Sequence, residues 1–173
     1  LSLGQSSEPI AISREVRRAR ALGVVCVAAT GNDGMAPVSW PARSSVVLAV
    51  SAGGVLGAWP EGAITARNVA ADPAPVGECF FASFSNIGPE VDFIGPGVGI
   101  ISWVNAQSKG VMDGTSMACP AVTGLMARLL SRHPDLISAE RNQQRSDDVI
   151  RMANDHAQPI GFGKEYEGAG LIG

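Results

Sequence analysis

The sequence predicts an α/β fold in which helices cover a mostly parallel sheet. Two runs, residues 24–29 and 46–50, are apolar throughout, which is typical of strands buried on both faces of a parallel sheet. The 173 residues are 46% apolar, so the chain can bury a sizeable core. A helix is predicted after residue 116 by an apolar stripe at three- and four-residue spacing, made of Val122, Leu125, Met126, Leu129 and Leu130.

The first predicted element is a helix that begins near Glu8 and Pro9. Ser7 is its expected N-cap, and Gly23 is its expected stop. The strand at residues 24–29 follows. The face that this helix turns to the core is expected to consist of Ile12, Val16, Ala19 and Leu22.

The next buried strand is residues 46–50, and a further strand is predicted at residues 100–103. Between them, residues 54–80 are rich in Gly, Ala and Pro and lack sustained periodicity, which predicts a variable surface insertion. A short closing helix is expected at residues 147–153. No internal repeat and no linker divides the chain, so residues 1–173 form part of one domain.

Charge and hydropathy exclude two classes of partner. The net charge is -3, and the densest basic cluster, Arg14 to Arg20, is best interpreted as a solvated helix face, so nucleic acid is not an expected partner. No apolar run approaches the roughly 20 residues that a membrane-spanning helix needs. The three cysteines have no metal-ligand spacing and predict neither a zinc site nor a disulfide framework.

Ser116 is the first candidate functional residue. It follows a glycine turn at the start of the predicted helix, where unpaired N–H groups and the helix dipole favour an oxyanion. That position suits a nucleophile. On spacing alone, a plain helix cap is the favoured interpretation, because Ser and Thr are preferred there.

Four segments together resemble one protein family. Residues 114–120 read Gly-Thr-Ser-Met-Ala-Cys-Pro and resemble the nucleophile motif of the subtilisin-like serine proteases, or subtilases (peptidase family S8). Residues 1–4 resemble that family's substrate-binding strand, and residues 28–34 resemble the segment that carries its oxyanion-hole asparagine. Residues 84–98 resemble the run that precedes its nucleophile. The motif residues around Ser116 are Gly114, Thr115, Met117, Ala118 and Pro120.

The resemblance implies a subtilisin-like three-layer fold and a role for each matching residue. Ser116 would be the nucleophile of a serine endopeptidase, and Asn32 would donate a hydrogen bond in the oxyanion hole, although on local sequence alone Asn32 reads equally as a turn residue. A polypeptide would be the substrate. The resemblance places substrate binding at Ser2, Leu3, Gly4, Ala29, Thr30 and Gly31, with Ala28 beside them.

The same resemblance identifies what this chain lacks. Subtilases need an aspartate and a histidine upstream of the serine, but His133 and His156, the only histidines, both follow Ser116. We therefore expect the chain to be the C-terminal half of a catalytic domain, inactive alone, with the N-terminal half as its partner. Exposed apolar surface would then favour self-association. The alternative is a pseudoprotease that binds peptides or acts as a scaffold.

No cofactor is identifiable from the sequence. Calcium is possible through the family resemblance alone, because no acidic cluster of EF-hand type is present. Asp33 and Asp92 are instead expected to serve turns and local hydrogen bonds.

Overall fold

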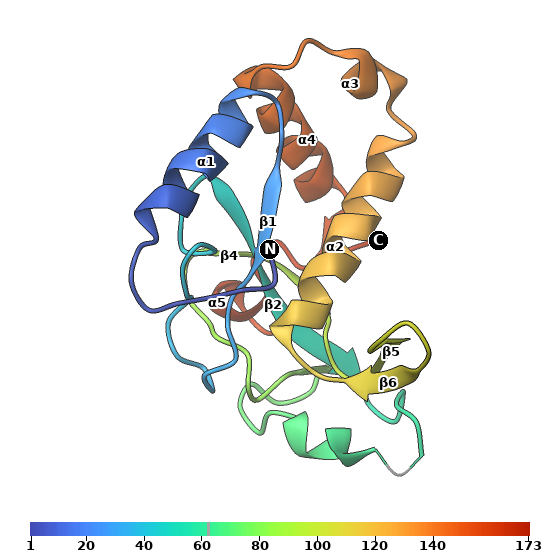
Figure 1. The fold of residues 1–173 in the computed structure, drawn as a ribbon. Helices are drawn as coiled ribbons and strands as arrows, with labels where there is room; N and C mark the ends of the chain where they lie inside the picture. The colour runs from blue at the N-terminus through green and yellow to red at the C-terminus, as the bar shows by residue number, and fades with distance from the viewer. Residues whose placement is uncertain (62) are drawn as a thin grey trace.

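A computed structural model describes residues 1–61 and 63–173 (Figure 1). The elements, in chain order, are α1 (Ile10–Ala21), β1 (Cys26–Ala29), β2 (Val47–Val55), the 3-10 helix η1 (Ile64–Asn68), β3 (Cys79–Phe81), β4 (Val91–Pro96), β5 (Ile100–Trp103), β6 (Lys109–Met112), α2 (Thr115–Leu130), α3 (Pro134–Ser138), α4 (Gln143–Asp155), β7 (Ala157–Gln158), α5 (Lys164–Glu167) and β8 (Leu171–Ile172).

The sheet is built around β2. Strands β1 and β4 pair with β2 on opposite sides, both in parallel, and β3 pairs antiparallel with the last residues of β2. The first seven residues of β2 are all buried, as expected for a strand covered on both faces. The predicted α/β fold with a mostly parallel sheet is confirmed.

Helices cover both faces of this sheet (Figure 1). On one face, Val122, Met126 and Leu129 of α2 share a core with Val27 and Leu48. Helix α4 extends that core. On the other face, Val16 of α1 packs in a separate core with the intervening strand residues, which are Ala28, Ala49 and Val91. Successive side chains of each strand point to opposite faces of the sheet, so helices pack on both faces. This gives the three layers that the family resemblance implied.

The first helix differs from its prediction at both ends. Its N-cap is Pro9 rather than Ser7, and no side chain caps it, so the Ser7 prediction is wrong. The helix ends at Ala21, and Leu22, which was expected on the face turned to the core, is 52% exposed, so that part of the prediction is wrong. The expected stop at Gly23 is confirmed, since its φ of 76° is a conformation that glycine adopts readily.

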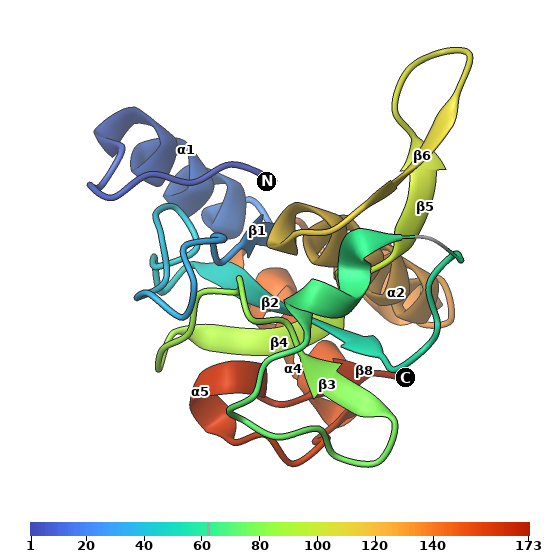
Figure 2. The same ribbon diagram turned by 90° about the horizontal axis from the view of Figure 1, so that it is seen from below.

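The predicted strand at residues 100–103 exists as β5 but lies outside the main sheet. Among the described residues it pairs with β6 alone, in an antiparallel hairpin that projects away from the body of the molecule (Figure 2). Its apolar side chains are therefore solvated: Ile101 is 61% exposed and Trp103 is 62% exposed. Strand β4, which sequence reasoning did not predict, completes the parallel sheet.

Residues 54–80 combine the end of β2, the 3-10 helix η1 and the beginning of β3, and residue 62 lies outside the described residues. Part of this stretch is buried, since Thr65, Ala70 and Phe80 are at most 3% exposed. The Ala70 N–H donates to the Phe81 carbonyl at 3.0 Å, which ties the stretch to β3. Across the described part of the chain, no helix is long and apolar enough to cross a membrane.

Candidate active site

The candidate site lies where β1 ends and α2 begins. Gly31 and Asn32 follow the last residue of β1, and α2 starts directly after Gly114. Sites of α/β proteins gather at this carboxyl edge of a parallel sheet, because the loops that leave the strands meet there. Two segments more than 80 residues apart in the sequence thus meet at one place.

The turn before Ser116 depends on Gly114, which is the N-cap of α2 with φ 155° and ψ 155°. This is a conformation that residues with a side chain rarely adopt. Ser116 is the second residue of the helix and is half-buried. The N-cap of α2 is Gly114 rather than Ser116, so the interpretation of Ser116 as a helix cap is wrong.

Asn32 is held by Thr115, the residue before Ser116. Its Oδ1 accepts hydrogen bonds from the Thr115 backbone N–H and from the Thr115 hydroxyl, both at 2.9 Å. Thr115 Oγ1 in turn accepts from the Gly31 N–H at 3.3 Å. Because Oδ1 faces two donors, the other end of the amide, Nδ2, is left to donate elsewhere.

Nδ2 of Asn32 and the Ser116 backbone nitrogen border the same small space. A Cβ built on Gly114 would lie 3.6 Å from Nδ2 and 3.7 Å from that nitrogen. Glycine leaves the space open. Met117 Sδ, at 3.5 Å from the same position, also borders the space. A side-chain amide and a backbone N–H at the start of a helix stabilise an oxyanion when both donate into one space.

A cleft of about 690 Å³ contains most of the predicted substrate residues. Its walls include Ser2, Leu3, Gly4, Ala29, Gly31, Asn32, Thr115 and Ser116. Thr30 and Ala28 do not line the cleft, because both are 0% exposed. Of the remaining motif residues, Ala118 is fully buried and Pro120 is exposed on the first turns of α2.

The segment that precedes α1 runs along the cleft and is anchored at both ends. Leu1 donates to the Val27 carbonyl at 2.6 Å and accepts from the Ala29 N–H at 3.1 Å, which extends the sheet beside β1. Gln5 exchanges two backbone hydrogen bonds with Trp40, both 2.9 Å. Ser2 Oγ donates to the Ser116 carbonyl at 3.0 Å, so the segment also contacts the nucleophile turn.

Sequence reasoning missed the polar wall of this cleft, which includes Asp33, Ser39 and Arg43. Asn86, at 0% exposure, organises that wall. Its Oδ1 accepts from the Asp33 N–H at 2.7 Å, and its Nδ2 lies 3.0 Å from Asp33 Oδ2 and 3.3 Å from Ser39 Oγ. Asn86 lies in residues 84–98, the run that resembles the family's segment before the nucleophile, but only the fold reveals its partners.

Neither histidine belongs to this site. His133 follows α2, whose residues from Ser116 to Leu130 span roughly 20 Å at the usual rise per residue. His133 instead stacks edge-on against His156, with ring centroids 6.2 Å apart. Within the described residues, no three histidine, cysteine or acidic side chains are grouped to hold a metal ion.

Comparisons with known proteins agree on one family. Residues 1–163 match the sequence model of the subtilase family. The chain is 31% identical to subtilisin NAT of Bacillus subtilis subsp. natto over 99% of its length, and 32% identical to the halolysin-like extracellular serine protease Nep of Natrialba magadii over 87%.

The chain spans only 38% of the length of subtilisin NAT and 22% of the Nep protein. In fold, it is similar to the solved structure of the prenylagaramide maturation protease PagA, with a TM-score of 0.69 and 22% identity. That similarity covers 98% of this chain and 56% of PagA. The motifs, the site geometry and these matches agree: the chain belongs to the subtilase family of serine proteases.

Proposed function

We propose that this chain supplies the nucleophile and the oxyanion hole of a subtilisin-type serine endopeptidase. The observation that carries the proposal is the bond between Asn32 and Thr115, which leaves the Asn32 amide N–H and the Ser116 backbone N–H at one open space. A helix cap or a turn asparagine would not need this arrangement.

The proposed chemistry is acyl transfer. Ser116 Oγ attacks the scissile carbonyl carbon while a histidine accepts its proton, and the carbonyl oxygen takes up negative charge in the oxyanion hole. The peptide C–N bond then breaks, and the histidine returns the proton to the leaving amine. Water hydrolyses the resulting ester at Ser116 and regenerates the hydroxyl.

A polypeptide in extended conformation fits the cleft. The main chain of residues 2–4 makes no backbone hydrogen bond to the described part of the protein, although Leu1 and Gln5 on either side do. Such a held but unpaired segment can accept a substrate strand by β-augmentation. We assign Ser2, Leu3 and Gly4 to that pairing, and Ala29 and Gly31 to the neighbouring wall.

The base and its orienting aspartate would come from another part of the same catalytic domain, so this chain alone would be inactive. An apolar groove of about 280 Å³ beside β1, lined by Val24, Val27, Met126 and Leu130 among others, offers that part a packing surface. Without the other part of the catalytic domain, this groove is exposed and the chain is expected to self-associate. Sedimentation velocity of the isolated chain and of the full-length protein tests the expected self-association. A monomeric isolated chain would contradict that expectation.

The proposed activity is tested with a fluorophosphonate, which labels activated serines, followed by peptide mapping. We expect the full-length protein to be labelled at Ser116, whereas the isolated chain and the Ser116→Ala full-length variant remain unlabelled. A folded full-length protein without label at Ser116 would overturn the proposal.

A second candidate is a pseudoprotease that binds peptides without cleaving them. The observation in its favour is that the described residues place no histidine near Ser116. Binding of an extended peptide to an unlabelled full-length protein would support this candidate, while labelling at Ser116 would eliminate it.

A further inference from the structure

Asp113 lies three residues before Ser116, in the short connection between β6 and α2. Each of its carboxylate oxygens has its own donor: Oδ1 accepts from the Gly99 N–H at 2.6 Å, and Oδ2 accepts from Asn68 Nδ2 at 2.7 Å. Hydrogen bonds to an ionised group are short and strong. Asn68 comes from residues 54–80, the stretch that sequence reasoning interpreted as a surface insertion.

Asn68 is itself firmly placed. It is the last residue of η1, and its carbonyl accepts from the Ser83 N–H at 2.8 Å. The next residue, Val69, forms an antiparallel bridge with Ala82. On the inner side of η1, Thr65 is 2% exposed. The Asn68 amide is therefore presented to Asp113 from a segment that is fastened to the body of the protein.

The connection that carries Asp113 is also held where α2 begins, because the N–H and the hydroxyl of Thr115 donate to Asn32 Oδ1. The β5–β6 hairpin on its N-terminal side pairs only with itself and projects outward (Figure 2). On its C-terminal side, the Gly114 N–H donates to the Gly97 carbonyl at 2.8 Å. Between the hairpin and this bond, the side-chain contacts of Asp113 are what tie the connection to neighbouring segments.

We propose that Asn68 is a positioning residue for catalysis. Through Asp113 it fixes the connection that presents the Ser116 hydroxyl and backbone N–H, so the stretch around η1 acts as a brace for the nucleophile. This inference rests on the proposed function of Ser116. A small displacement of a nucleophile or an oxyanion donor is sufficient to reduce turnover strongly, because the reaction needs close alignment of the reacting atoms.

The test exchanges the two partners in the full-length protein. Asn68→Ala removes the donor, and Asn68→Asp sets one carboxylate against another. The double variant combines Asn68→Asp with Asp113→Asn. The amide at position 113 then accepts from the Gly99 N–H and donates to the carboxylate at position 68. Both hydrogen bonds are restored, and the negative charge has moved from position 113 to position 68.

We expect kcat to fall about tenfold in Asn68→Ala and further in Asn68→Asp, with KM changed less than twofold, by the alignment argument. The rate of fluorophosphonate labelling should fall in parallel. The exchanged double variant should recover to within about threefold of the wild-type kcat, because its geometry is conserved.

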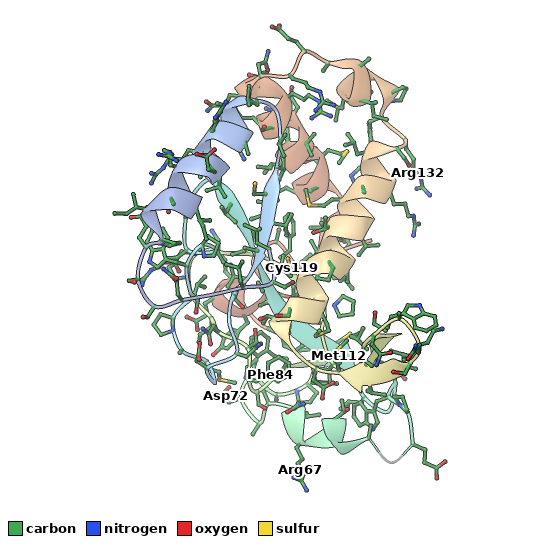
Figure 3. The ribbon with its side chains drawn as sticks, in the orientation of Figure 1. Arg67, Asp72, Phe84, Met112, Cys119 and Arg132 are labelled. Carbon is green, nitrogen blue, oxygen red and sulfur yellow. The ribbon has the colours of Figure 1, made fainter. Side chains whose placement is uncertain are left out.

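Arg67→Ala is the matched control, because Arg67 belongs to the same turn and its side chain points away from the body of the protein (Figure 3). The kcat of Arg67→Ala should equal that of the wild type. Thermal unfolding is measured for every variant to compare their stability. The inference is overturned if Asn68→Ala and Asn68→Asp keep the wild-type kcat, or if the double variant fails to recover. A wild-type protein that is not labelled at all would instead overturn the proposed function.

Discussion

Asn32 Oδ1 lies 2.9 Å from both the backbone nitrogen and the hydroxyl oxygen of Thr115. The residue next to the nucleophile thus orients the side chain that would stabilise the oxyanion. Thr115 therefore links Asn32 to the turn that carries Ser116, and altering Thr115 should disturb both side chains.

Asn32→Ala should reduce kcat in the full-length protein while KM stays within about twofold, because the lost bond forms in the transition state. The expected size is that measured in subtilisin, a member of this same family, where loss of the oxyanion-hole asparagine costs about 10²–10³-fold in turnover. Steady-state kinetics on a peptide substrate measures it. An unchanged kcat would remove Asn32 from the oxyanion hole.

Thr115→Val should reduce kcat about fivefold, since one of the two donors to Asn32 Oδ1 disappears and a net hydrogen bond contributes about 1 kcal/mol. The Gly31 N–H also loses its acceptor. Thr115→Ser keeps the hydroxyl and serves as the control, with an expected kcat near that of the wild type. Equal activity of the valine and serine variants would contradict this orienting role.

Burial raises the pKa of Asp92 to about 6, against the lowering effects of the Ala49 N–H bond and of Arg20. The Asp92 carboxyl lines a cavity of about 390 Å³ together with Arg20, Arg43 and Glu90. The folded protein therefore binds a proton here between about pH 4 and pH 6 that the unfolded chain has released. By linkage, the contribution of Asp92 to stability is greatest at low pH and is lost as the pH rises to 6.

Asp92→Asn should remove this dependence. Relative to the variant, the wild type should lose up to roughly 3 kcal/mol of unfolding free energy between pH 4 and pH 7, from the size of the shift. Urea unfolding of both proteins at several pH values measures the difference. A stability gap that is the same at pH 4 and pH 7 would show that burial does not control this carboxyl.

The sequence was sufficient for the elements whose signals are local. Residues 46–50 are apolar throughout, and all but the first lie in β2, which runs on to Val55; Val122, Met126 and Leu129 of the stripe after Ser116 are buried in α2. Ser7 was misassigned because a favourable cap residue does not fix where a helix begins; the backbone of Pro9 does. Likewise, the apolar residues among positions 100–103 predicted a strand, but they could not indicate that this strand would pair in a solvated hairpin.

The residues of the candidate site also fall into those that the sequence predicts and those that only the fold reveals. Ser116 and Asn32 could be found because they sit in recognisable motifs, and they meet in the structure. The Asn86 and Asn68 contacts could not be found, because each joins positions more than 40 residues apart in the chain. Asn68 is also surrounded by sequence without periodicity. Long-range polar pairs of this kind leave no spacing pattern, so only the fold reveals them.

Gly114→Ala is expected to reduce activity far more than it reduces stability. The φ of 155° at this position disfavours a side chain and should cost about 1–3 kcal/mol of folding free energy. The added methyl group would also enter the space beside Asn32 Nδ2 and the Ser116 backbone nitrogen, which the oxyanion would occupy. Turnover and fluorophosphonate labelling at Ser116 should therefore both fall by at least a factor of about 10², the loss expected for one oxyanion donor.

Gly161→Ala separates these two effects. Its φ of 116° imposes a comparable backbone cost, but the nearest atoms to an added Cβ are methyl groups of Val76 at 3.8 Å and 3.9 Å, outside the cleft. This variant should lose stability and keep its kcat and its labelling rate. If Gly161→Ala lost activity as strongly as Gly114→Ala, general destabilisation would explain both, and the open space at Gly114 would have no special role in catalysis.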